Sequence, residues 1–195
     1  MQPYSNACEN NKVPILTILQ SVLSDVSSVL EIGTGTAQHA VYFAPLMPHL
    51  TWQTSDVIDN HPGIMSWLDA LPASNLLPPL ELDLRDDWQI RQYDAVFTSN
   101  TLHIVDQTLV IAFFKKISQC LNVGGKLCIY GPFNYGGQFT SESNAEFDNW
   151  LKVKNITSGI RDFEWICELA KQAKLELIHD HTMPANNRLL EFVKR

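Results

Sequence analysis

The chain has 195 residues, which is enough for one domain with a full hydrophobic core. Its hydrophobic content of 45% and charged content of 18% are typical of a globular protein. A net charge of −7, without any cluster of Lys and Arg, argues against binding to nucleic acid or to an anionic membrane surface.

The first half of the chain alternates between helical and strand patterns. Apolar residues recur at helical spacing after Pro14, a residue that suits the first turn of a helix. Pro45 and Pro48 end the next helix. The predicted helices cover residues 14–25, 37–46 and 64–71, and the predicted strands cover residues 29–32, 50–55 and 80–84.

The second half continues this alternation around one irregular insert. Gly124 and Gly125 are expected to end a helix as a C-terminal cap. Residues 131–160 are polar and rich in glycine, without a strong period, and we expect them to form a mobile substrate-side insert. The predicted helices cover residues 109–121 and 161–174, and the predicted strands cover residues 93–98, 126–130, 175–182 and 189–194.

Alternating strands and helices indicate an α/β fold with a mostly parallel, doubly wound sheet and helices on both faces. The last two of the seven predicted strands are joined by a short turn, so they must form an antiparallel hairpin. We therefore expect one domain over residues 1–195, with residues 1–27 as an N-terminal cap and helix.

Localisation and metal binding are predicted from what the chain lacks. The N-terminal stretch is polar and no apolar run approaches the roughly 18 residues of a membrane span, which favours a cytoplasmic protein. The cysteines form no C-x-x-C pair and show no zinc-ligand spacing, so we expect reduced thiols and no metal. They are Cys8, Cys120, Cys128 and Cys167.

The stretch Val29–His39 carries the most specific pattern. A short apolar strand leads to Glu31 and then to a turn with Gly33 and Gly35, a device that brings a nucleotide-like ligand close to backbone. Gln38 stands where the dinucleotide fingerprint G-x-G-x-x-G has its third glycine. The acid at the strand end suits a positively charged ligand group better than a pyrophosphate, although a purely structural turn remains an alternative.

Polar residues also follow the next three predicted strands. Asp56, Asp83 and Asn100 lie at their carboxyl ends, where ligands bind in sheets of this kind. Each has a structural alternative: Asp56 could cap a helix, Asp83 could be an ordinary loop acid, and Asn100 could satisfy loop backbone.

The pattern Glu31-x-Gly33-x-Gly35-x-Ala37 resembles the first motif of class I S-adenosylmethionine-dependent methyltransferases, with Ala37 in place of the last glycine. The resemblance implies S-adenosyl-L-methionine as cofactor and a Rossmann-like methyltransferase fold. It also implies that the turn, with Thr34 inside it, passes the methionine moiety while Glu31 neutralises its ammonium group.

The same resemblance gives roles to the other strand ends. Asp56 would accept hydrogen bonds from both ribose hydroxyls, which match a carboxylate with two oxygens. Asp83 would accept from the adenine amino group, with Leu84 beside the ring, and Asn100 completes the expected cofactor site.

Nearly the whole chain also resembles a narrower group, a methyltransferase-like family of unknown function found in bacteria and animals. That resemblance supports the fold and the cofactor and supplies no substrate. It rests on residues 9–12, 29–40, 52–56, 100–104, 130–133, 141–147, 159–162 and 183–187.

The end of the fourth strand bears on the methyl acceptor. Enzymes that methylate planar exocyclic or amide nitrogen usually have Asn/Asp-Pro-Pro-Tyr there, and this chain has Thr-Ser-Asn-Thr-Leu-His over residues 98–103. Adenine-N6 and glutamine-amide transfer are therefore disfavoured. No aspartate pair near Asn100 matches a magnesium-dependent catechol methyltransferase, which again predicts no metal.

The predicted catalytic residues are His103, Tyr130 and Arg161. His103 is the best candidate base by its ordinary pKa, and Arg161 is the best anchor for a carboxylate-bearing acceptor. The alternatives stay open: His103 could pack on a helix, Tyr130 could be a core residue, and Arg161 could pair with Asp162 or Glu164.

The sequence therefore predicts a methyltransferase for a small-molecule acceptor, with neither nucleic acid nor membrane as partner. Two alternatives remain, a regulatory protein that binds the cofactor without chemistry and an NAD- or nucleotide-dependent enzyme. The sequence does not determine whether the protein is a monomer or a homodimer, nor which atom of the acceptor is methylated.

Overall fold

A computed structural model describes residues 2–195. Seven strands form one sheet in the order β3-β2-β1-β4-β5-β9-β8. Within this sheet β9 alone runs opposite to the other strands, so the predicted doubly wound sheet with a C-terminal antiparallel hairpin is confirmed. The strands are β1 Ser28–Ile32, β2 Thr51–Asp56, β3 Leu76–Glu81, β4 Tyr93–Ser99, β5 Leu121–Gly131, β8 Leu175–Thr182 and β9 Arg188–Lys194.

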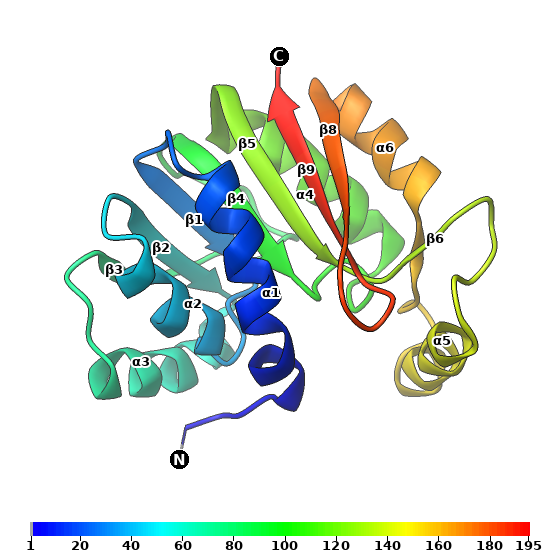
Figure 1. The fold of residues 1–195 in the computed structure, drawn as a ribbon, viewed down its shortest axis with the longest axis horizontal. Helices are drawn as coiled ribbons and strands as arrows, with labels where there is room; N and C mark the ends of the chain where they lie inside the picture. Colours follow the sequence, from blue (N-terminus) through cyan, green and yellow to red (C-terminus); the bar gives the residue numbers. More distant parts are fainter. Residues whose placement is uncertain (1) are drawn as a thin grey trace.

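Helices cover both faces of the sheet (Figure 1). On one face α1, α2 and α3 bury a cluster that includes Trp52 and Phe97, and on the other α4 and α6 bury a cluster that includes Phe113 and Phe192. The helices are α1 Asn6–Val22, α2 Gln38–Phe43, α3 His61–Ala70, α4 Gln107–Cys120, α5 Glu142–Lys154 and α6 Phe163–Gln172, with short 3₁₀ turns η1 Ala44–Leu46 and η2 Ile58–Asn60.

The first helix begins earlier than predicted. Ser5 caps α1 by accepting a hydrogen bond from Cys8 N, and Pro14 lies inside the helix rather than in its first turn. The early turns are polar, so apolar periodicity could not reveal them. They are held instead by contacts to distant residues, such as the 2.6 Å hydrogen bond between Asn11 Oδ1 and His39 Nε2.

The predicted irregular insert, residues 131–160, contains α5 and the two-residue strand β6 Phe133–Asn134, which pairs with β7 Arg161–Asp162. The sequence predicts no helix or strand in this insert, so both elements were missed. The buried positions of α5 are Asn144, Asp148 and Leu151, a mostly polar face that hides the helical period. Figure 1 shows α5 beyond the carboxyl ends of the parallel strands, at the edge where the N-terminal segment also lies.

Two smaller boundaries also differ from the prediction. The third strand ends at Glu81, so Asp83 and Leu84 follow it rather than lie in it. Gly124, with φ of +77°, lies within β5 where the pairing with β4 shifts register, and α4 already ends at Cys120. Across residues 2–195 no helix combines the length and the apolar character that crossing a membrane requires.

Candidate functional site

The glycine turn between β1 and α2 uses its two glycines differently. Gly33 has φ of +70°, and a Cβ there would lie 2.8 Å from Thr101 Oγ1, so the turn is packed against the segment after β4. Gly35 has φ of +60°, but the nearest atom to its hypothetical Cβ is Gly33 O at 3.9 Å. Gly33 thus allows close packing, whereas Gly35 leaves open space in which a ligand can approach the backbone.

Gln38, which stands where the dinucleotide fingerprint has its third glycine, has a structural role. Its side chain is buried, and Oε1 accepts hydrogen bonds from Ser5 N at 2.6 Å and from Thr36 Oγ1 at 3.0 Å. The residue before it, Ala37, adopts φ of +64°, a left-handed conformation that glycine would accept at lower cost. Gln38 therefore fastens the N-terminal segment onto the turn.

Glu31, at the carboxyl end of β1, is a buried acid without a cationic partner among residues 2–195. Its side chain is only 2% exposed, and Oε2 accepts hydrogen bonds from Trp52 Nε1 at 3.0 Å and from Thr34 Oγ1 at 3.3 Å. No side chain or backbone group of the described chain donates to Oε1. Burial, opposed by these two hydrogen bonds, raises the pKa of Glu31 to about 7.

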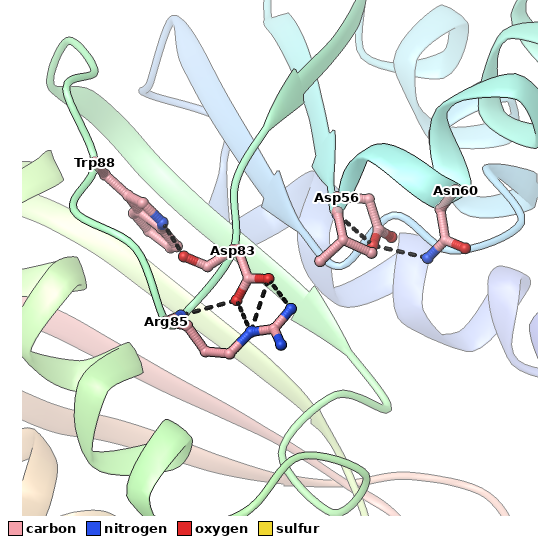
Figure 2. A network of polar contacts seen from close by, with 6 residues as sticks. Asp56, Asn60, Asp83, Arg85 and Trp88 are labelled. Atoms are coloured by element: carbon pink, nitrogen blue, oxygen red, sulfur yellow. Dashed lines mark hydrogen bonds and ion pairs between the residues drawn. The ribbon is translucent and has the colours of Figure 1, made fainter.

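Asp56, at the end of β2, is bound to the same turn. Its Oδ2 accepts from Gly35 N at 2.7 Å, and its Oδ1 accepts from Val57 N and from Asn60 Nδ2, both at 2.8 Å. Figure 2 shows Asp56 and Asn60 side by side at this edge. The carboxylate is fixed in orientation close to Gly35, where the open space lies.

Asp83 faces the same edge from the loop after β3 (Figure 2). Both of its carboxylate oxygens accept from the Arg85 guanidinium, and Trp88 Nε1 donates to its backbone carbonyl at 2.7 Å. This ion pair lowers the pKa of Asp83. Leu84, the next residue, is buried among apolar side chains that include Leu82.

Asn100 and His103, in the loop after β4, both lie beside Gly131, the last residue of β5. A Cβ on Gly131 would lie 3.6 Å from His103 Nδ1 and 4.0 Å from Asn100 Oδ1. Asn100 adopts φ of +57°, and its backbone N donates to Tyr130 O at 2.9 Å. The missing side chain at position 131 therefore leaves space next to both polar groups.

The His103 imidazole is buried and neutral. Burial, together with the charge of Arg161, lowers its pKa to about 4. Phe147 from α5 packs edge-on against the ring, with centroids 5.3 Å apart. No hydrogen bond from another of residues 2–195 reaches either ring nitrogen, so a neutral imidazole is left free to accept a proton from a ligand.

Tyr130 is buried on the other face of β5, among residues packed under α1. The Asn11 and Asn187 side chains lie close enough to its hydroxyl to lower its pKa, against a larger raising effect of burial. Its hydroxyl thus lies between α1 and the turn that joins β8 and β9. These contacts favour a structural role for Tyr130 over a catalytic one.

Arg161 is buried in a network of backbone contacts. Its Nε donates to Leu102 O at 3.0 Å, and its Nη2 donates to Val105 O and to Thr157 O. It makes no ion pair with Asp162 or Glu164. The guanidinium holds the loop that carries His103, and these contacts favour a positioning role over an anchor for an acidic acceptor.

The structure thus brings Glu31, Asp56 and the glycine turn together by direct contacts, and His103 together with Asn100. Sequence reasoning missed Trp52, which forms the strongest contact to Glu31, and Gln38 as a link to the N-terminus. In the sequence Trp52 looks like an ordinary core residue, because the apolar pattern of a strand does not show whether an indole N–H donates a hydrogen bond. Only the position of β2 beside β1 shows that the two side chains meet.

Several solved structures share this architecture at low sequence identity. An O-methyltransferase family protein from Burkholderia thailandensis matches with a TM-score of 0.83 and 17% identity over 94% of this chain and 56% of its own. An O-methyltransferase family 2 protein from Planctomyces limnophilus, solved with apigenin, matches with a TM-score of 0.81 and 17% identity over 95% of this chain and 57% of its own. PigF, solved with SAH, matches with a TM-score of 0.79 and 14% identity over 93% of this chain and 61% of its own.

The chain therefore spans little more than half the length of these proteins. At such identities the likeness establishes the class I methyltransferase fold. A family model described as "Protein of unknown function (DUF938)" matches residues 2–194, and the chain belongs to that family.

Proposed function

We propose that this protein is an S-adenosylmethionine-dependent methyltransferase that acts on a small-molecule acceptor. The observation that carries the proposal is Glu31, a buried carboxyl group with one oxygen held by Trp52 and Thr34 and the other without a donor among residues 2–195. Burying an unpaired carboxylate is costly, and a cationic ligand group offsets that cost. The ammonium group of the cofactor's methionine moiety has the required charge.

The other groups at this edge fit the rest of the same ligand. The open space beside Gly35 would admit a thioether or sulfonium chain next to backbone, and the fixed Asp56 carboxylate suits a ribose diol. Asp83 is paired with Arg85, whose side chain is 72% exposed, so a ligand amino group can displace it at small cost.

An NAD-dependent function fits less well. A pyrophosphate at this turn would face Glu31 and Asp56, two carboxylates, without a compensating lysine or arginine from the turn. Electrostatic repulsion therefore disfavours a dinucleotide, whereas a ligand with a positive group is favoured.

When bound, the cofactor supplies an electrophilic methyl group: the sulfur–carbon bond breaks as the acceptor–carbon bond forms. The chain supplies alignment and a proton acceptor. His103 is neutral at physiological pH and its ring accepts no hydrogen bond from the described residues, so its imidazole would accept the proton that a hydroxyl or amine acceptor loses; with a pKa of about 4 it does so as a weaker base than an ordinary histidine. Leu102 and His103 are buried, and Phe147 packs against the His103 ring, which limits the contact of the imidazole with water.

The acceptor is proposed as a small molecule without a specific demand for a carboxylate. Arg161 is the best candidate anchor for such a group, and its Nε and Nη2 already donate to backbone carbonyls. The net charge of −7 also favours a neutral or cationic acceptor over an acidic one.

Calorimetry with S-adenosylhomocysteine and NAD tests the cofactor. We expect saturable binding of S-adenosylhomocysteine at one site per chain and no measurable binding of NAD. Tight binding of NAD without binding of S-adenosylhomocysteine would favour the dinucleotide alternative.

A second experiment separates an enzyme from a cofactor-binding regulator. The protein is incubated with S-adenosylmethionine and a small-metabolite extract, and S-adenosylhomocysteine is quantified by mass spectrometry. We expect formation that depends on both protein and extract. Cofactor binding with no formation in extracts from several sources would support the regulatory alternative.

A further inference from the structure

The Thr34 and Trp52 side chains both donate hydrogen bonds to the Glu31 carboxylate. The glycine-turn motif gives neither of them this role. Thr34 Oγ1 accepts from Ser55 N at 3.0 Å, so its single hydroxyl proton is free to point at Glu31 Oε2, 3.3 Å away. Trp52 Nε1, fully buried in β2, donates to the same oxygen at 3.0 Å. Two donors therefore converge on one oxygen, and no group in the described part of the chain donates to the other.

The same threonine links two parts of the candidate cofactor site. Thr34 N donates to Ser55 O at 3.0 Å, and Ser55 Oγ donates to Glu31 O at 2.6 Å. The threonine thus extends the pairing of β1 with β2 into the glycine turn. Because Asp56 follows Ser55 directly, the acid for the ammonium and the acid for the ribose are held in one rigid unit.

We propose that Thr34 and Trp52 are positioning residues that fix Oε2 of Glu31 and thereby direct Oε1 to the amino group of the bound ligand. The inference rests on the proposed function, since it assumes a ligand with an ammonium group at this turn. The contacts form a chain from Ser55 N through the Thr34 hydroxyl to the carboxylate, in which each hydrogen bond strengthens the next. Neither residue needs to touch the ligand.

Loss of either donor should change the pH dependence of ligand binding, because few other charged groups surround Glu31. The titratable groups that face it are Asp56 on β2, which disfavours its ionisation, and the Cys8 thiol on α1. Among residues 2–195 no lysine or arginine side chain forms an ion pair with it. Removal of a donor therefore disfavours the ionised form further and moves the onset of ammonium binding to higher pH.

The test compares two ligands and three variants. S-adenosylhomocysteine carries the amino-acid group, whereas 5′-methylthioadenosine keeps the adenosine and thioether and lacks it. Thr34→Val removes the hydroxyl at constant shape, Thr34→Ser restores it, and Trp52→Phe removes the indole N–H. Trp67→Phe is the matched control for loss of an indole N–H, since the Trp67 indole donates to Pro3 O at 2.7 Å and not to Glu31.

We expect Thr34→Val and Trp52→Phe each to weaken S-adenosylhomocysteine binding about tenfold, the usual effect of losing a hydrogen bond to a charged group. The pH midpoint of binding should rise, while the Kd of 5′-methylthioadenosine should stay within about twofold. Thr34→Ser and Trp67→Phe should retain the wild-type profile.

Equal losses for both ligands, or an unchanged pH midpoint in Thr34→Val, would overturn the positioning role. Thermal melts of each variant show whether a loss of binding comes from misfolding. If Trp52→Phe does not fold, Thr34→Val still tests the positioning role. If the wild-type protein binds neither ligand, the proposed function fails instead, so the two failures are distinguishable.

Discussion

The two halves of the candidate site are built in different ways. On the donor half, Glu31, Asp56 and the glycine turn are tied to one another by short hydrogen bonds across adjacent strands. On the acceptor half, His103 has no hydrogen-bond partner on its ring among the described residues, and its loop is held through backbone carbonyls by Arg161. A fixed half suits one constant cofactor, whereas a half with free polar groups suits chemistry on a variable acceptor.

The largest effect should come from the acceptor half. Replacing His103 with alanine removes the proposed base, and we expect turnover to S-adenosylhomocysteine to fall about 10²- to 10⁴-fold. Binding of S-adenosylhomocysteine itself should change little. Steady-state turnover with an acceptor-containing extract, together with calorimetry, measures both quantities.

His179→Ala provides the control, because His179 is exposed on β8, away from the site. With a pKa of about 4, His103 should add no ionisation step to the rate between pH 6 and 9. Full activity in His103→Ala would remove the distinction between the two halves.

Arg161→Ala tests whether this residue holds the loop or the acceptor. The substitution leaves the carbonyls of Leu102, Val105 and Thr157 without their donor, and we expect a loss of about 3 kcal/mol in the free energy of unfolding. Urea denaturation, with exposed Lys115→Ala on α4 as control, gives the value. Unchanged stability with a raised KM for acidic acceptors only would restore the anchor hypothesis.

Glu31→Gln tests the donor half through stability. The folded-state pKa of Glu31 is about 7, above its ordinary value of 4.5, so the native state binds the extra proton between these pH values. The contribution of Glu31 to the free energy of unfolding is therefore greatest below pH 4.5. It decreases as the pH rises through 7, by about 3 kcal/mol in total.

The glutamine variant should lack this loss, so its unfolding free energy relative to wild type should increase between pH 4.5 and 7. Denaturation at a series of pH values measures the difference. A difference that stays constant over this range would mean that Glu31 titrates normally.

The smallest effect is expected for Arg85→Ala. The Arg85 side chain is exposed, and a solvated ion pair contributes little, so affinity for S-adenosylhomocysteine should change by no more than about threefold. Competition calorimetry detects a change of this size. A loss well above threefold would instead mean that Arg85 contacts the ligand directly.

The sheet could be predicted from sequence because buried strands and amphipathic helices have clear periods. Residues 175–182 formed a strand with the predicted bounds, and the acids at the strand ends followed from the topology. The helix α5 could not be predicted, since its buried face carries Asn144 and Asp148. The start of α1 was missed for a similar reason, because long-range hydrogen bonds hold its polar turns.

Side-chain partners were the least predictable part of the site. The sequence indicated that Arg161 is special, but its bonds to backbone carbonyls depend on where residues 102–105 fold. The bond from Trp52 to Glu31 depends likewise on the pairing of β2 with β1. The residue type indicates which reactions a side chain can take part in. Its tertiary contacts determine whether its polar atoms are already hydrogen-bonded within the protein or remain available to a ligand.

The most direct test is calorimetric titration of wild-type protein and Glu31→Gln with S-adenosylhomocysteine at pH 8. We expect binding at one site per chain that weakens about tenfold or more in the variant, because the ligand's ammonium loses the buried carboxylate proposed to neutralise it. Absence of binding to the wild-type protein, or equal affinity for both proteins, would contradict it.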